Sequence, residues 1–117
     1  MHVIVETEMF LRAAKLTGVS DEEREGIVSW LAANPTAGDV IQGTGGVRKA
    51  RIAAKGKGKS GGYRVITFFG GNDMPLFLLT IYAKGDRADL SPEMRKAVTS
   101  VAEIIKQEFH RPWRKKR

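Results

Sequence analysis

The chain has 117 residues, a net charge of +7 and no cysteine. This length suits one domain, and the lack of cysteine excludes disulfides, thiolate metal sites and a cysteine nucleophile. The absence of cysteine also suits a reducing cytosol, so we expect a cytoplasmic protein. The longest apolar run, residues 75–83, is shorter than the roughly 20 residues of a membrane helix, and the N-terminus lacks the order of a secretory signal, so we expect no membrane partner.

The opening residues predict a strand followed by a helix. Residues 2–6 alternate apolar and polar side chains, which is typical of a short strand. Thr7 is well placed to cap a helix that runs to about Thr17, with Gly18 as its C-terminal stop.

A second helix is predicted directly after the first. Ser20 and Glu23 have the spacing of a capping box, and Asn34-Pro35 ends the helix because a residue before proline resists the helical region. The two helices should form a hairpin. The residues that we expect the second helix to bury are Ile27, Trp30 and Leu31.

The rest of the chain predicts strands and one more helix. After a short extended piece at 39–41, the GTGG turn leads into a predicted strand at 47–54. Two further strands are predicted at 63–69 and 76–83, which are rich in β-branched and aromatic residues. Ser91-Pro92 then starts a helix that continues to about Phe109.

The order of these elements predicts an α+β fold. It consists of an N-terminal strand and helical hairpin, an antiparallel sheet of about four strands, and a C-terminal helix, with the helices on one side of the sheet. We expect one domain over residues 1–110, followed by a basic C-terminal tail at 111–117.

Charge is distributed unevenly along the chain. Residues 1–39 carry a net charge of −4, whereas residues 40–72 contain seven basic residues and no acid. Lys49 and Arg51 share one face of their strand by the two-residue period, and Arg64 projects from the next strand. A cluster on a rigid sheet favours a polyanionic partner over a merely solvated loop.

The run GKGKSGG at residues 56–62 ends like a nucleotide-binding P-loop. A Walker loop needs a glycine at position 53, which is Ala53 here, and a helix directly afterwards. The residues that follow predict a strand, so ATP binding is not expected.

The run GTGGVRKARIAAKGKGKSGGYRVITFF, followed by LLTIYAKGDRADLSPEM, resembles the RelE/ParE superfamily of toxins from bacterial toxin-antitoxin modules, most closely its HigB-type branch. The similarity covers most of the chain. Its most specific part is the serial order of glycine-rich turn, basic strand, Lys/Gly loop, Gly-Tyr-Arg-Val strand and TIYAK strand.

The resemblance implies a RelE-like fold and a ribosome-dependent mRNA endoribonuclease, an mRNA interferase that inhibits translation. Its partners would be mRNA, the ribosome and a cognate antitoxin protein of the helix-turn-helix type, with operator DNA bound only through the antitoxin. No cofactor is implied, and the expected cleavage is metal-independent.

The resemblance places an arginine of the catalytic site on Arg64. Arginine carries a permanent charge and a fixed donor fork, which suits it to clamp the oxygens of a phosphate. The alignment of the family's two lysines on the preceding strand stays open between Lys49 with Arg51 and Lys55 with Lys57. The predicted catalytic residues are Arg64, Lys84 and Lys57, and the predicted RNA-binding residues are Arg48, Lys49, Arg51, Lys55, Lys59 and Arg87.

Two other functions remain open at this stage. A gyrase-poisoning toxin of the ParE kind would use a protein surface and would need no catalytic cluster. A non-enzymatic RNA-binding or ribosome-binding module would bind RNA in a salt-sensitive way but would not cut it.

Overall fold

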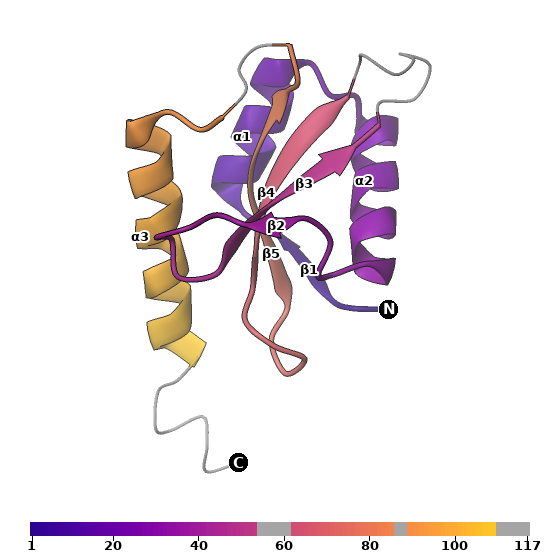
Figure 1. The fold of residues 1–117 in the computed structure, drawn as a ribbon. Helices are drawn as coiled ribbons and strands as arrows, with labels where there is room; N and C mark the ends of the chain where they lie inside the picture. The colour runs from indigo at the N-terminus through magenta and orange to yellow at the C-terminus, as the bar shows by residue number, and fades with distance from the viewer. Residues whose placement is uncertain (54–61, 86–88, 110–117) are drawn as a thin grey trace.

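The computed structural model describes residues 1–53, 62–85 and 89–109 and has the expected α+β fold (Figure 1). No helix among these residues is both long enough and apolar enough to cross a membrane. The elements in chain order are β1 (Ile4–Glu6), α1 (Glu8–Thr17), α2 (Asp21–Ala33), β2 (Asp39–Val40), β3 (Val47–Ile52), β4 (Tyr63–Phe69), β5 (Leu76–Ala83) and α3 (Pro92–Phe109).

The helix boundaries follow the predicted capping residues. The hydroxyl of Thr7 accepts a hydrogen bond from the backbone N–H of Phe10 at 3.1 Å, and Gly18 ends α1 with a φ of 84°. In α2, Ser20 and Glu23 form the reciprocal capping box. These local hydrogen bonds satisfy backbone groups that the helix itself leaves without partners, which is why the sequence alone could locate them.

The sheet differs from the prediction in strand number and direction. It has five strands in the order β1-β5-β4-β3-β2, and β1 runs parallel to β5, pairing Ile4 with Leu76. The expected antiparallel pairing therefore holds for β2 to β5, whereas the sheet has five strands rather than about four and pairs β1 in parallel. A parallel pair needs a long crossover connection, and local periodicity contains no information about so distant a partner.

The helices cover both faces of the sheet, so the expectation that they lie on one side was also wrong. Phe10 of α1 and Leu31 of α2 belong to one apolar cluster, whereas Val98 of α3 belongs to a second cluster with Ile66. Figure 1 shows α2 and α3 flanking the sheet from opposite sides. Strand β5 is buried from Leu76 to Tyr82 without alternation because each face packs against a helix.

Trp30 does not lie in the core. Ile27 and Leu31, one helical turn apart, are almost fully buried, whereas Trp30 is 45% exposed. Its position is rotated by roughly 100° from that of Leu31 around the helix axis, which brings it to the side of the buried stripe. The prediction that it fills the core was wrong.

The structure also bears on the P-loop resemblance. Residues 63–69 are strand β4, so the helix that a Walker loop requires does not follow the GKGKSGG run. The loop itself, apart from Gly62, falls outside the described residues, and so does the basic tail at 111–117.

Candidate nucleic-acid interface

Three neighbouring strands place Arg51, Arg64 and Tyr82 in one row across the sheet. Arg51 pairs with Arg64 across β3 and β4, and Arg64 pairs with Tyr82 across β4 and β5. Residues that pair directly have their side chains on the same face. Tyr82 belongs to the apolar cluster of α3, so the two arginines project from the α3 face of the sheet.

A cavity of about 760 Å³ opens beside this row. Among the described residues, its charged lining consists of four basic side chains and one acid. These are Lys49, Arg51, Arg64, Lys84 and Asp39. The excess of positive charge, on neighbouring strands rather than on one loop, suits the cavity to an anion such as a phosphate group.

Three of the basic residues have no acidic partner in the described part of the chain. Within the described ranges, no ion pair joins Arg51, Arg64 or Lys84 to a carboxylate. Arg64 is half-buried, while Arg51 and Lys84 are exposed. No described carboxylate therefore competes with an incoming anion for their donor groups.

Lys49 differs from these three because it holds an ion pair. Its Nζ lies 3.0 Å from Oδ1 of Asp89, which precedes α3. The hydrogen bond from Lys49, and then its charge, lower the pKa of the Asp89 carboxyl below its ordinary value. Asp89 thus neutralises one cation at the rim of the cavity.

Lys84 follows the last residue of β5, where the strand pairing still holds the backbone. Its N–H donates to the carbonyl of Gly62 at 3.0 Å, so the β4–β5 ladder continues past Ala83. This bond holds the backbone of Lys84, and its side chain is exposed.

Arg48 lies on the opposite face of β3 from Lys49. Its guanidinium donates to the carbonyl oxygen of Thr36 at 2.6 Å and lies 5.8 Å from the centre of the Phe69 ring. Phe69 packs against the cluster of α1 and α2. Of the RNA-binding residues predicted from the sequence, the structure does not bring Arg48 together with Lys49 and Arg51.

Tyr63 links the strand of Arg64 to the start of α2. Its hydroxyl donates to the carboxylate of Glu23, with oxygen distances of 3.2 and 3.3 Å, and the same carboxylate accepts from the backbone of Ser20. Burial, followed by the charge and hydrogen bond of Glu23, raises the pKa of Tyr63. Because Tyr63 directly precedes Arg64, this contact holds the start of β4 against α2.

Four predicted site residues lie outside the described parts of the chain. They are Lys55, Lys57, Lys59 and Arg87. Across residues 1–53, 62–85 and 89–109, no group of three or more His, Cys, Asp or Glu side chains is placed to hold a metal ion.

Sequence reasoning did not assign to the site two residues that line the cavity. Asp39 pairs with Lys49 across β2 and β3, and Trp30 reaches the cavity from α2. Asp39 could have been found from the sequence. It lies in the short extended piece before the basic strand, and an acid in a neighbouring strand must pair with a residue of that basic strand. For Trp30, the signal was its offset from the stripe of Ile27 and Leu31.

Comparison with known families gives an independent result. A family model described as the RelE toxin of the RelE/RelB toxin-antitoxin system matches residues 2–112. The match includes every strand of the sheet and every residue that lines the cationic cavity.

Proposed function

The chain belongs to the RelE toxin family, and from this premise we propose that it is a ribosome-dependent mRNA endoribonuclease that inhibits translation. The single observation that carries the proposal is the pairing of Arg51 with Arg64 at a cavity where neither has an acidic partner among the described residues. Two cations that face each other across neighbouring strands repel each other. A phosphate bound between them would replace this repulsion with two charge-assisted interactions.

The proposed reaction is an internal displacement within the RNA. The 2′-oxygen of one nucleotide forms a bond to the neighbouring phosphorus, and the bond from phosphorus to the 5′-oxygen breaks. The products are a 2′,3′-cyclic phosphate and a free 5′-hydroxyl. One proton leaves the 2′-hydroxyl and one proton reaches the departing 5′-oxygen, so that the step is balanced.

Each charged group of the cavity suits one part of this reaction. The guanidinium of Arg64 holds the non-bridging oxygens, on which negative charge accumulates, and Arg51 assists it. The carboxylate of Asp39 accepts the proton of the 2′-hydroxyl. The ammonium group of Lys84 donates a proton to the leaving oxygen. The proposal needs no metal ion, because fixed cations supply the positive charge.

The remaining assignments rest on the sequence resemblance. We place the chain in the HigB-type branch and expect a cognate antitoxin of the helix-turn-helix type that binds operator DNA. Action on translating ribosomes places the protein in the cytoplasm. Lys57 is proposed to act with Arg64, and the proposed RNA contacts outside the described residues are Lys55, Lys59 and Arg87.

Induction of Arg64→Ala in cells tests the proposal directly. Removal of one oxyanion donor typically lowers the catalytic rate by about 10²–10³-fold. We expect primer extension on translated message to show cuts after induction of the wild type and their loss in the variant. Arg12→Ala is the matched control, because Arg12 is an exposed arginine of α1 that does not line the cavity.

Two results would contradict the proposal. The first is growth arrest with intact message and altered DNA supercoiling, which is the behaviour of a gyrase poison. The second is full cleavage activity in Arg64→Ala when circular dichroism shows that the variant is folded.

A further inference from the structure

An apolar groove lies beside the cationic cavity, between α2 and the ends of β3 and β4. Its volume is about 480 Å³, within the range of roughly 300–1,000 Å³ that is typical of ligand sites. Ile27, Ile52 and Tyr63 are among the residues that line it. Trp30 and Arg51 line both the groove and the cavity, so the two hollows adjoin.

Trp30 presents an aromatic surface at the place where the hollows meet. The side chain is 45% exposed, although the other large apolar residues of the inner α2 stripe are buried. An indole ring offers a large flat surface on which another aromatic ring can stack. Its exposure has no explanation in the packing of the core.

Gly26 lines the groove without a side chain. It lies within α2, and a Cβ atom built on it would meet nothing within 4 Å. Glycine in the middle of a helix is less favourable than alanine. Packing therefore does not require this glycine, whereas a groove that admits a flat ring benefits from the missing side chain.

The charges around the groove select against a second phosphate. Of the described residues, Glu22 and Glu23 line it together with one cation, Arg51. Carboxylates repel a phosphate, but they accept hydrogen bonds from the exocyclic amino groups of nucleobases. The occupant that fits is uncharged, flat and joined to an anion in the neighbouring cavity.

We propose that this groove binds an unpaired nucleobase of the RNA whose phosphate rests at Arg64, with Trp30 as the stacking surface. The inference rests on the proposed function and extends it to a base subsite. Single-stranded RNA is commonly held by this combination of a basic track and an aromatic platform.

Substitutions in the groove should weaken RNA binding in a graded way. Trp30→Ala should lower the affinity about 5- to 150-fold, the range of base stacking on an aromatic side chain. Trp30→Phe keeps a ring and should retain most of the affinity. The hydrogen bond from Asn34 goes to the main-chain oxygen of Trp30 and survives both changes.

Gly26→Leu is a second variant that does not depend on Trp30. Leucine is a far better helix former than glycine, so this protein should be at least as stable as the wild type. The new side chain would occupy the groove and should reduce RNA affinity at least tenfold. Ile104→Ala serves as the control, because Ile104 is an exposed apolar residue of α3, on the other side of the sheet from α2.

Fluorescence provides a readout that does not depend on cleavage. The chain has two tryptophans, so Trp113→Phe leaves Trp30 as the only one. In this background, a short single-stranded RNA should quench the emission of Trp30. The same RNA with abasic riboses should bind more weakly and quench little.

The outcomes separate this inference from the proposed function. Equal quenching by intact and abasic RNA, or unchanged affinity in both Trp30→Ala and Gly26→Leu, would overturn the base subsite even if Arg64→Ala abolishes cleavage. Base-dependent quenching in a protein that never cuts message would support the subsite and overturn the nuclease. Binding of an apolar peptide with no response to RNA would overturn the subsite as well.

Discussion

Arg51 and Arg64 are direct partners across β3 and β4. Like charges in this arrangement destabilise a sheet by up to about 1 kcal/mol. We therefore predict that Arg51→Ala leaves the free energy of unfolding unchanged or raises it by up to that amount, while RNA cleavage falls. Urea unfolding and a cleavage assay on the same preparation measure the two effects.

Arg12→Ala is the control for general loss of charge and should change neither quantity. Phosphate or sulfate should stabilise the wild type more than Arg51→Ala, because an anion that binds the folded protein raises its stability. A marked loss of stability in Arg51→Ala without added anion would contradict this view of the pair.

A second prediction concerns Asp39, the carboxylate among the described residues of the cavity lining. Asp39→Asn removes a negative charge, so RNA should bind at least as tightly as before. Loss of the proton acceptor should lower the rate of cleavage by about 10²–10⁴-fold. Measured together, single-turnover cleavage and RNA affinity distinguish a role in chemistry from a role in binding.

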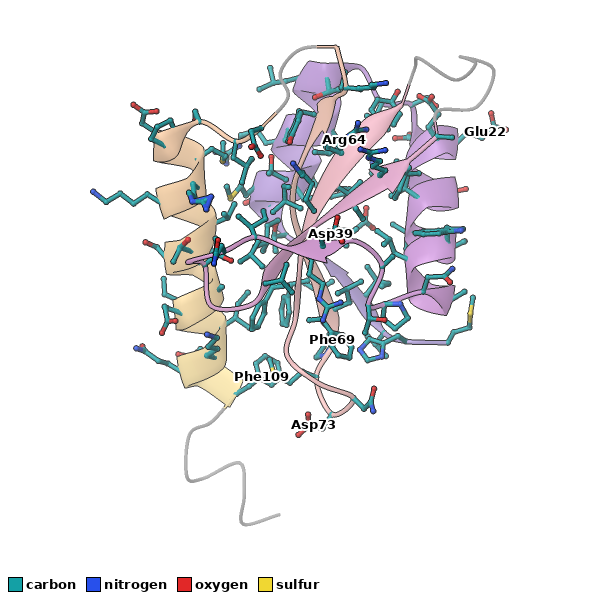
Figure 2. All side chains as sticks on the ribbon, in the orientation of Figure 1. Glu22, Asp39, Arg64, Phe69, Asp73 and Phe109 are labelled. Carbon is teal, nitrogen blue, oxygen red and sulfur yellow. The ribbon has the colours of Figure 1, made fainter. Side chains whose placement is uncertain are left out.

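Asp73→Asn is the matched control for this change. Asp73 is exposed in the turn between β4 and β5, at the end of the sheet opposite Arg64 (Figure 2). It should leave both cleavage and binding unchanged. If Asp39→Asn cleaved at the wild-type rate, the proton acceptor would have to be another group.

The third prediction follows from the ion pair of Lys49 with Asp89. Asp89→Asn frees a cation at the rim of the cavity, so one more phosphate contact becomes available. The slope of log affinity against log salt should become steeper by about 0.7 for single-stranded RNA. Titrations at several salt concentrations measure the slope, and an unchanged slope would place Lys49 outside the RNA contact.

The pH dependence of this pair has a definite sign. The pKa of Asp89 is lower in the folded protein than its ordinary value. The ion pair therefore stabilises the folded protein fully above the ordinary pKa of an aspartate. This stabilisation is lost as the pH falls through the lower pKa that Asp89 has in the folded protein. At neutral pH the pair is intact, and acid should free Lys49 in the wild type but make no difference in Asp89→Asn.

The sequence predicted the parts of the fold that depend on neighbours in the chain. Thr7 and Gly18 bound α1 because their interactions reach only three or four residues. The limits of β4 and β5 agree with the predicted ranges because turn residues and β-branched runs are equally local. The sequence did not predict the partner of β1, because the pairing of Ile4 with Leu76 joins residues that are far apart in the chain.

One feature of the sequence is consistent with helices on both faces of the sheet. Residues 76–82 are apolar or small almost without interruption, which is typical of a strand covered on both faces. The cationic site could be predicted in part, because alternation put Lys49 and Arg51 on one face. Arg48 belongs to the other face by the same rule, whereas the contribution of Trp30 from α2 depends on tertiary packing.

The last prediction uses the contact between Tyr63 and Glu23. Tyr63→Phe removes a hydroxyl that donates to a carboxylate at 3.2 and 3.3 Å. At neutral pH the variant should be less stable by about 1 kcal/mol, the usual net value of one hydrogen bond. Urea unfolding of both proteins between neutral and alkaline pH measures this difference.

The difference should vanish at high pH. The pKa of Tyr63 is raised in the folded protein, first by burial and then by Glu23. The hydroxyl therefore stabilises the fold fully below the unfolded pKa of about 10, and this stabilisation is lost as the pH rises through the folded value. A difference that stayed constant through this range would mean that Tyr63 contributes through its ring alone, and the link between β4 and α2 would then be one of packing.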